Sequence, residues 1–386
     1  MIKQYVIIGA GNGGQSLAGD MVLRGAPVSA IYSRGKKAID SIKIRGGIQM
    51  SGPIVKGFAP IKLATNDLKE AIDAGNVFLV CTTANAYNEL AKQIAAYVKP
   101  EHTYLLIPGY IGSSVMFAKT LSENGVTEMP LIGETMSFPY ATRLIKPAHA
   151  GIMLRKKVLP IAAFPATRGQ DLLDTIKPAI FEAELEQDTL VTGFNNVQAV
   201  LHVAPYLLNM DKAEAPRKCD IDFHTWGKTT VLRLQNEMDK ERCAVAAALG
   251  IKTLTNPETA ELYYDGKQYK PLAQKTKKLS PNAIQVPDRY IDEDVPYALV
   301  PLSAFAKKLG IHTPVTDAMI QMSCVVRGRD FIKEGVTLET LGFCNMSPDE
   351  IKMYFKQGYN ELNELQHDEC SYTVCCPRYN VISKTS

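Results

Sequence analysis

The stretch Tyr5-Val6-Ile7-Ile8-Gly9-Ala10-Gly11-Asn12-Gly13-Gly14 lies near the start of the chain and decides the fold of its first half. Four apolar residues indicate a buried strand, and the glycines that follow have the spacing G-x-G-x-x-G ahead of a helix predicted over residues 13–25. In this context the first glycine allows a tight turn, the second lets a pyrophosphate approach the backbone, and the third lets the helix pack against the strand. A glycine-rich turn in an ordinary α/β protein is the less favoured alternative. The residues predicted to bind a dinucleotide are Gly9, Gly11, Asn12, Gly13 and Gly14.

A second predicted strand, Val28-Ser29-Ala30-Ile31-Tyr32, ends at the basic sequence Ser33-Arg34-Gly35-Lys36-Lys37. NAD-binding units usually carry an acidic residue here, which accepts hydrogen bonds from the adenosine ribose hydroxyls. This sequence has no aspartate or glutamate at that point, and an arginine forms paired, charge-assisted contacts with a phosphate. We therefore expect Ser33, Arg34 and Lys37 to bind a 2′-phosphate, so that NADP(H) is favoured over NAD(H). A solvated basic loop is the alternative explanation of the same residues.

Length and composition limit the class of protein. A chain of 386 residues is too long for one ordinary core and indicates two domains. With 46% hydrophobic and 22% charged residues it has the composition of a globular protein, and no run approaches the ~20 apolar residues of a membrane span. The net charge of +3 gives no reason to expect a nucleic acid or a membrane as partner. Because no apolar signal segment precedes the first strand, we expect a cytoplasmic protein.

The eight cysteines do not indicate a metal site. None belongs to a C-x-x-C pair, and the only cluster is Cys370-x4-Cys375-Cys376 near the C-terminus. No histidine has a matching spacing there, and two adjacent cysteines have poor geometry for binding one metal ion. We therefore predict no metal ligands.

Alternating strands and helices are predicted up to about residue 165. Residues 77–81 and 103–107 are short apolar runs, typical of strands buried on both faces of a parallel sheet. Loops at the carboxyl ends of such strands form the ligand crevice of a doubly wound sheet. The residues of the first such loop that we expect beside the cofactor are Thr82, Thr83 and Ala84.

Helical periodicity replaces the strand signals after about residue 185. Helices are predicted over residues 190–208, 229–249, 298–309 and 316–328. The sequence thus predicts an α/β domain with a Rossmann-like doubly wound sheet in residues 1–185, followed by a mostly helical substrate domain in residues 186–386. The active site is expected in the cleft between the two domains.

His202 is the candidate acid or base, because the sequence has only six histidines with a pKa near neutrality. It follows Asn196 in an apolar segment from which both side chains could project toward a cleft. A lone histidine in an apolar helix is more often a satisfied core residue. The run Arg289-Tyr290-Ile291-Asp292-Glu293-Asp294 changes this balance, since an arginine can hold a carboxylate and an aspartate can fix a histidine tautomer. A solvated acidic loop with an incidental arginine is the alternative.

Several motifs, in this order, resemble those of the octopine/nopaline (opine) dehydrogenase family over nearly the whole chain. They are the glycine motif with Gln15, Glu134-Thr135 with Pro139-Tyr140 and Arg143, Asn196 to His202-x-x-Pro205, Asp294-Val295-Pro296-Tyr297, and Gly310-Ile311-His312-Thr313-Pro314. This family couples a 2-oxo acid, often pyruvate, to the amino group of an amino acid and reduces the imine with NAD(P)H. The resemblance implies an oxidoreductase with those two small-molecule substrates, and it leaves a homodimer open.

The resemblance also implies roles for individual residues. His202 would be the catalytic acid/base, Asp294 its partner, and Arg289 the group that binds the oxo-acid carboxylate. Asn196 would contribute to the substrate site. Glu134 would either approach the amino acid or serve as a structural carboxylate.

Two departures from the family pattern are Gln198, where asparagine is frequent, and Ala298, where glycine is common, and neither removes a catalytic group. Two other functions stay open. A ketopantoate-type C=O reductase has a similar pair of domains but typically relies on a lysine and an acidic residue. A non-catalytic NADP(H)-binding regulator would have no reason to retain the arginine, aspartate and histidine together.

Overall fold

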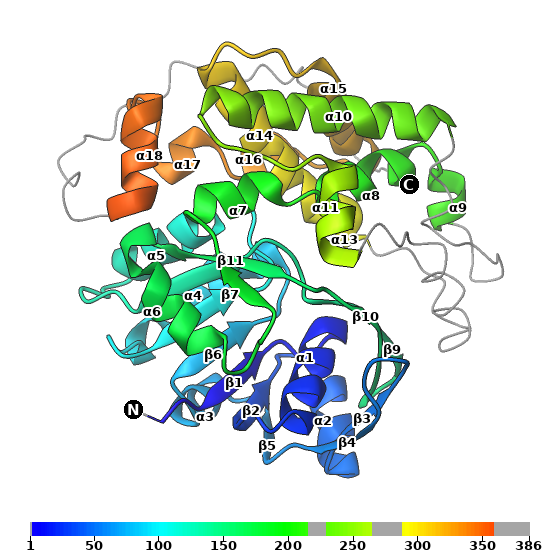
Figure 1. The fold of residues 1–386 in the computed structure, drawn as a ribbon, viewed down its shortest axis with the longest axis vertical. Coiled ribbons are helices and arrows are strands. Elements are labelled where there is room, and N and C mark those ends of the chain that lie inside the picture. The colour runs from blue at the N-terminus through cyan, green and yellow to red at the C-terminus, as the bar shows by residue number, and fades with distance from the viewer. Residues whose placement is uncertain (1, 215–228, 265–287, 359–386) are drawn as a thin grey trace, which may run out of the picture.

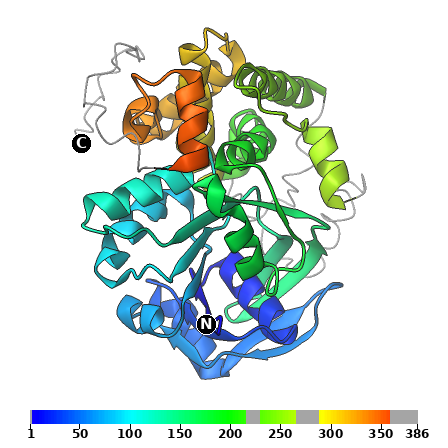
Figure 2. The same cartoon turned by 60° about the vertical axis from the view of Figure 1, so that its left-hand side comes forward.

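The computed structural model describes residues 2–214, 229–264 and 288–358. Figure 1 shows the strands gathered in the half of the molecule that carries the N-terminus, with the later helices packed on one side of it. The turned view in Figure 2 shows the same division. The predicted Rossmann-like sheet followed by a mostly helical part is therefore confirmed. In the described residues the last strand ends at Leu185, and the domain boundary placed there remains a prediction.

Eight strands form the large sheet, in the order β12-β11-β8-β7-β6-β1-β2-β5. They span Tyr5–Ile8 (β1), Val28–Tyr32 (β2), Leu63–Thr65 (β5), Val77–Val80 (β6), Thr103–Leu106 (β7), Leu131–Thr135 (β8), Leu159–Phe164 (β11) and Ala183–Leu185 (β12). All neighbouring strands are parallel except β8 and β11. From β5 to β8 this is the doubly wound order, in which ligands bind where the strand order reverses, between β1 and β6.

Helices cover both faces of the large sheet because successive side chains of each strand point to opposite sides. The covering helices are α1 (Asn12–Leu23), α2 (Lys36–Arg45), α3 (Leu68–Asp73), α4 (Tyr87–Ile94), α5 (Ser113–Glu123) and α6 (Gly169–Ile176). On β1, Tyr5 and Ile7 share a core with α1, α2 and α6. Val6 and Ile8 share the other core with α3, α4 and α5, and this core continues into the helical half.

A second sheet of four strands, in the order β4-β3-β10-β9, is not predicted by the sequence pattern. Its strands are β3 (Gly47–Ser51), β4 (Gly57–Pro60), β9 (Tyr140–Lys146) and β10 (His149–Arg155). Half-exposed residues interrupt the alternation of buried residues in β9, so the strand pattern there is weak. The small sheet is joined to α1, whose buried Asp20 accepts a hydrogen bond from Tyr140 Oη at 2.6 Å and pairs with Arg155.

The helix predicted over residues 190–208 is in fact two helices, α7 (Thr189–Asn195) and α8 (Gln198–Leu207). Asn196 ends α7 with an extended ψ of 103°, and its Oδ1 accepts a hydrogen bond from the amide of Gln198 at 3.0 Å. An asparagine side chain that bonds the backbone two residues on competes with a continuous helix. The break therefore separates Asn196 from the helix that carries His202.

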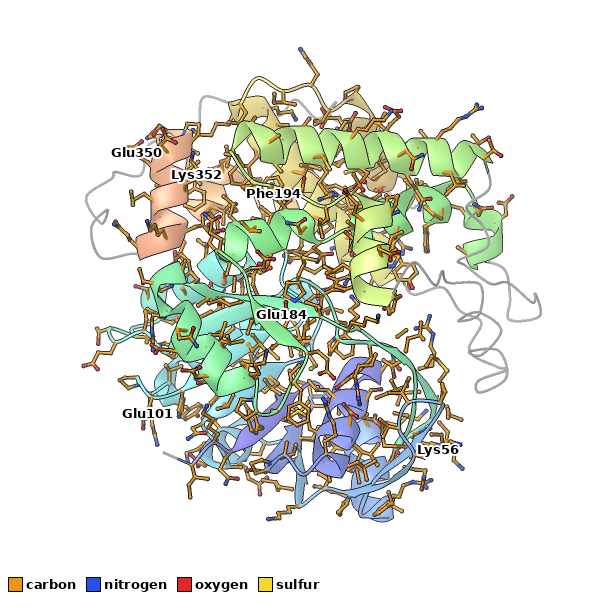
Figure 3. The ribbon with its side chains drawn as sticks, in the orientation of Figure 1. Lys56, Glu101, Glu184, Phe194, Glu350 and Lys352 are labelled. Atoms are coloured by element: carbon orange, nitrogen blue, oxygen red, sulfur yellow. The ribbon has the colours of Figure 1, made fainter. Side chains whose placement is uncertain are left out.

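The helical half is built mainly from α10 (Thr229–Ala248), α14 (Val300–Lys308) and α15 (Pro314–Arg327), which correspond to three of the predicted helices. Its shorter elements are α9 (Met210–Glu214), α11 (Asn256–Tyr264), α13 (Arg289–Asp292), the π-helical turn η5 (Val295–Leu299), α16 (Phe331–Glu334), α17 (Leu338–Leu341) and α18 (Pro348–Gln357). Three short 3-10 helices belong to the first half: η1 (Ala84–Ala86), η2 (Ala95–Tyr97) and η3 (Ala166–Arg168). Figure 3 places Phe194 of α7 between the sheet and these helices, where its ring packs against Phe305 with centroids 5.7 Å apart. Among the described helices, none is both long and apolar enough to cross a membrane.

Candidate active site

The glycine turn between β1 and α1 has the geometry of a nucleotide-binding turn. Gly9 has a φ of +109°, and a Cβ there would lie 2.8 Å from the carbonyl oxygen of Cys81. A Cβ at Gly14 would lie 1.7 Å from the carbonyl oxygen of Gly9. Gly11 is the N-cap of α1, and a Cβ there would meet nothing within 4 Å. Backbone packing therefore requires glycine at positions 9 and 14, whereas Gly11 leaves the backbone open to an approaching ligand.

Asn12 and Gly13 connect this turn to the segment that leads into β9. Asn12 Nδ2 donates to the carbonyl oxygen of Thr142 at 3.0 Å, while its buried Oδ1 has no partner in the described part of the chain. A Cβ at Gly13 would lie 2.8 Å from the ring of Phe138. Helix α1 has neither an acidic residue in its first turn nor a side-chain cap. Its N-terminus thus presents amide groups that fit a pyrophosphate.

The basic sequence after β2 is open at the surface. Arg34, Lys36 and Lys37 are exposed, and the half-buried Ser33 accepts a hydrogen bond from the amide of Gly35 at 3.2 Å. Helix α2 begins at Lys36 with no acidic residue in its first turn. No carboxylate of this turn therefore competes for the basic side chains predicted to bind a 2′-phosphate.

The loop after β6 is held by the helical half. The amide of Ala84 donates to Oε1 of Glu293 at 2.8 Å in a buried position. Thr83 Oγ1 donates to Asn85 Oδ1, and the buried Oγ1 of Thr82 has no partner among the described residues. Thr82 thus offers a hydroxyl to a ligand, whereas the amide of Ala84 is already satisfied by the protein.

His202 of α8 and Asp294, which precedes η5, form the central pair of the site. Both are buried, and His202 Nδ1 lies 2.7 Å from Asp294 Oδ2. Oδ1 of the aspartate accepts a hydrogen bond from Tyr110 Oη at 2.9 Å. The ring of Tyr290 stacks on the imidazole, with centroids 3.8 Å apart. The carboxylate and the aromatic ring together fix the orientation of the imidazole.

Burial lowers the pKa of His202, although the carboxylate of Asp294 opposes this shift. The positive charges of Arg289 and Arg143 lower the pKa further. Arg143 is a half-buried residue of β9, so the small sheet brings a cation toward the pair. The neutral imidazole is therefore favoured near pH 7 when no anion is bound.

Arg289 begins α13 and reaches Glu293 one helical turn later. Its Nη1 lies 3.4 Å from Glu293 Oε2, and 41% of the arginine side chain is exposed against 3% of the glutamate side chain. Burial alone would lower the pKa of Arg289, but Glu293, Tyr290, Tyr110 and Asp294 together outweigh burial and raise the pKa. The guanidinium therefore stays charged and keeps donors for a ligand.

Glu134 and Asn196 lie deeper and contact protein atoms. Glu134 on β8 is 0% exposed, and its carboxylate accepts hydrogen bonds from Thr192 Oγ1 at 2.8 Å and from the amide of Ser114 at 3.2 Å. Burial raises the pKa of Glu134 to about 8. Asn196 Nδ2 donates to the carbonyl oxygen of Gly109 at 2.7 Å. These contacts favour the structural alternative for Glu134 and give Asn196 a bond to the loop after β7.

The structure thus brings His202, Asp294 and Arg289 together, and it adds two residues that sequence reasoning missed. Tyr110 follows the carboxyl end of β7, the edge of the sheet where ligand-facing side chains are expected. The second missed residue is Glu293, whose i,i+4 spacing from Arg289 is typical of an ion pair on a helix and is a signal present in the sequence. Both missed residues contact the predicted catalytic or binding groups directly.

No group of three histidine, cysteine, aspartate or glutamate side chains in residues 2–214, 229–264 and 288–358 could hold a metal ion. The cysteine cluster at positions 370–376 lies outside the described residues.

Two family models match the chain. The model for the NAD/NADP octopine/nopaline dehydrogenase alpha-helical domain matches residues 185–327, and the model for NADP oxidoreductase coenzyme F420-dependent matches residues 4–107. A curated relative, the opine dehydrogenase of Arthrobacter sp. (strain 1C), is 30% identical over 358 residues, which cover 91% of this chain and 98% of the relative.

Solved structures with the same fold include octopine dehydrogenase and yersinopine dehydrogenase. A structure of octopine dehydrogenase with NADH and agmatine has a TM-score of 0.69 at 16% identity, covering 91% of this chain and 98% of that chain. Yersinopine dehydrogenase with bound NADP+ has a TM-score of 0.65 at 15% identity, covering 92% and 98%. At this identity the structures show a shared fold.

Proposed function

The chain belongs to the opine dehydrogenase family and is an NAD(P)-dependent oxidoreductase, and we propose that it couples a 2-oxo acid such as pyruvate to the amino group of an amino acid. A C–N bond forms at the oxo carbon, the oxo oxygen leaves as water, and hydride addition to the imine carbon completes the secondary amine. The observation that carries this proposal is the buried His202–Asp294 pair, 2.7 Å apart, beside the partly exposed Arg289.

The residues of the chain bind and orient the substrates and move one proton, while a bound nicotinamide supplies the hydride. Arg289 holds the carboxylate of the oxo acid through its exposed guanidinium nitrogens, which fixes the position of the reacting carbon. Nδ1 of His202 is bonded to Asp294, so the proton exchanged with the substrate is carried on Nε2. That proton goes to the oxygen that leaves as water, and the second proton of the water comes from the amino group as the C=N bond forms.

The oxo acid also prepares His202 for this role. The charges of Arg289 and Arg143 lower the pKa of the imidazole in the protein without ligands. A bound carboxylate compensates part of that positive charge, so we expect the pKa of His202 to rise when the oxo acid binds. His202 therefore takes up the proton that it later donates when the oxo acid is bound.

NADPH is the reductant that we propose. The exposed Arg34 and Lys37 beside Ser33, with no acidic residue in the first turn of α2, support binding of a 2′-phosphate. The glycine turn supports binding of the pyrophosphate, and the buried hydroxyl of Thr82, which has no partner among the described residues, supports a contact with a ligand. Octopine and yersinopine dehydrogenase have been solved with NADH and NADP+ respectively, so both cofactors occur on this fold. We further propose residues 1–185 as the nucleotide-binding unit and 186–386 as the substrate unit.

NADPH oxidation, followed by its near-ultraviolet absorbance, tests the proposal. With pyruvate and each standard amino acid in turn, we expect a rate that requires both substrates and that is lower with NADH. Oxidation with the 2-oxo acid alone, indifferent to amines, would contradict the proposal and indicate a ketopantoate-type reductase. NADPH binding without oxidation under every combination would indicate a non-catalytic regulator.

A further inference from the structure

Glu293 is a buried carboxylate to which the reaction described above assigns no role. It is 2% exposed and lies between Asp292 and Asp294 at the end of α13. A carboxylate taken out of water must be held by specific partners, because its burial is otherwise costly. The two oxygens of Glu293 have different partners, and these partners belong to different halves of the molecule.

The first oxygen holds the loop on the nucleotide side. Oε1 accepts a hydrogen bond from the amide of Ala84 at 2.8 Å, across 209 positions of sequence. Ala84 is 3% exposed and begins η1, directly after Thr82 and Thr83. This loop stands at the carboxyl end of β6, one of the two strands where the order of the sheet reverses.

The second oxygen holds the guanidinium on the substrate side. Oε2 lies 3.4 Å from Nη1 of Arg289, whose side chain remains 41% exposed. The same guanidinium stands 5.2 Å from the ring centroid of Tyr290, which stacks on His202. Glu293 and Tyr290 thus fix the arginine from inside and leave its outer nitrogens available.

We propose that Glu293 is a positioning residue of this active site, which aligns the guanidinium of Arg289 with the loop after β6. The inference rests on the proposed function, because that function assigns Arg289 to the oxo acid. One side chain holds both groups, so it sets the distance between the bound carboxylate and the nucleotide side of the cleft. The next residue, Asp294, orients His202, so two adjacent carboxylates position the two groups that act on the substrate.

The surroundings of Glu293 give its charge a defined dependence on pH. The titratable groups that face it are the cation Arg289, the anion Asp294 and the phenols of Tyr87, Tyr110 and Tyr297. Burial raises the pKa of Glu293 to about 7, although the charge of Arg289 opposes the shift. About half of the Glu293 carboxyl groups are therefore ionised near pH 7, so the ion pair with Arg289 strengthens as pH rises through this value and weakens as pH falls.

Two substitutions separate the two contacts. Glu293→Gln keeps an oxygen for the amide of Ala84 and removes the charge that faces Arg289. We expect it to raise KM for the oxo acid about tenfold, the scale of a charge-assisted hydrogen bond, and to leave Kd for NADPH within about twofold. Glu293→Ala removes both contacts, and we expect Kd for NADPH, measured by calorimetry, to rise as well.

The pH profile and a matched control complete the experiment. Titration of His202 contributes to kcat/KM for the oxo acid in both enzymes, so we compare their ratio. We expect kcat/KM of the wild type divided by that of Glu293→Gln to fall as pH drops below about 7. Glu334 also pairs with an arginine, Arg329, but at an exposed position. Glu334→Gln should therefore leave KM, Kd and the pH profile unchanged.

A Glu293→Gln enzyme with unchanged KM and an unchanged pH profile would overturn the inference, even if its Tm fell. So would a Glu293→Ala protein with the wild-type Kd for NADPH, since the loop would then not depend on the carboxylate. Should Glu293→Ala fail to fold, Glu293→Gln carries the test. Failure of the proposed function is distinct, because the wild type itself would then show no amine-dependent oxidation, while the calorimetric comparison would still report on the loop.

Discussion

The glycine turn and the proposed catalytic group are built in opposite ways. Residues 9–14 are adjacent in sequence, and backbone packing determines the shape of the turn that they form. The catalytic group joins Asp294 to His202, 92 positions away, and to Tyr110, 184 positions away. A local turn can be recognised from its spacing, whereas a dispersed group exists only once the whole chain has folded. Substitutions in the two regions should therefore have separable effects on cofactor binding and on turnover.

His202→Ala should show the largest effect, and this effect should be confined to turnover. Loss of a positioned acid or base lowers kcat by about 10²–10⁴, and we expect Kd for NADPH to stay unchanged. Steady-state rates and calorimetry measure the two quantities. The exposed His312 provides the matched control, His312→Ala. Near-normal turnover of His202→Ala would show that the assignment of the acid is wrong.

Glu134→Gln tests a buried carboxylate outside both regions, which joins the large sheet to the helical half: β8 carries it and Thr192 of α7 donates a hydrogen bond to it. The carboxyl titrates near 4.5 when unfolded and at about 8 when folded, so the folded protein keeps a proton that the unfolded chain releases. Stability from this group is complete below the lower value and is lost as pH rises, so the free energy of unfolding should fall by about 1.4 kcal/mol per pH unit between them. Urea unfolding at pH 6 and pH 8 should show a shallower pH dependence for Glu134→Gln.

A glutamine fits at position 134 because Thr192 can donate its hydroxyl to the carbonyl oxygen of Thr189, at 3.1 Å, and accept from the new amide. The control is Glu334→Gln, which should keep the slope of the wild type. An identical slope in Glu134→Gln and in the wild type would mean that Glu134 is ionised in the folded protein at pH 6.

Arg289→Ala should affect substrate binding more than turnover. Loss of a paired, charge-assisted contact with a carboxylate corresponds to about a 10- to 100-fold rise in KM for the oxo acid. We expect Kd for NADPH to change much less, because the arginine faces the substrate side. Arg233→Ala, at an exposed position of α10, is the control. Equal losses in kcat and in kcat/KM, with KM unchanged, would show that Arg289 acts in the chemical step and not in binding.

Arg34→Ala should have the smallest effect and should be confined to the nucleotide side. We expect Kd for NADPH to rise about tenfold while Kd for NADH stays the same, because only NADPH carries the 2′-phosphate. Arg45→Ala, at the exposed C-terminal end of the following helix α2, should change neither constant. Equal weakening of both cofactors would show that the arginine acts on the whole loop and not on the phosphate.

The parts of the fold with a local pattern could be predicted from the sequence. The predicted strand 28–32 is β2 to the residue, and the predicted helix 229–249 is α10 within one residue at its end. The small sheet could not be predicted, because β3 pairs with β10 about a hundred positions later. Half-exposed strands that find partners so far away leave little periodicity in their own sequence.

The pairing of His202 with Asp294, which we propose to be catalytic, is indicated by the resemblance to a family and not by residue spacing. His202 alone has the pattern of a core histidine, and no local feature reveals that Asp294 lies against it. The place of Ala84 after a buried strand predicts a position beside the cofactor, but no local feature reveals that its amide donates a hydrogen bond to Glu293. Contacts across such distances follow from tertiary packing.

The small sheet delays part of the folding of the chain during synthesis. A nascent polypeptide exposes α1 and β3 early, but their partners in residues 140–155 leave the ribosome only after most of the large sheet has emerged. Until then the Asp20 carboxylate can pair with Arg24, one turn along the same helix and 3.0 Å away in the finished fold, while Arg155 is still missing. A stalled chain that ends before residue 140 therefore lacks the strands β9 and β10 that pack against α1, although it already contains every glycine of the turn.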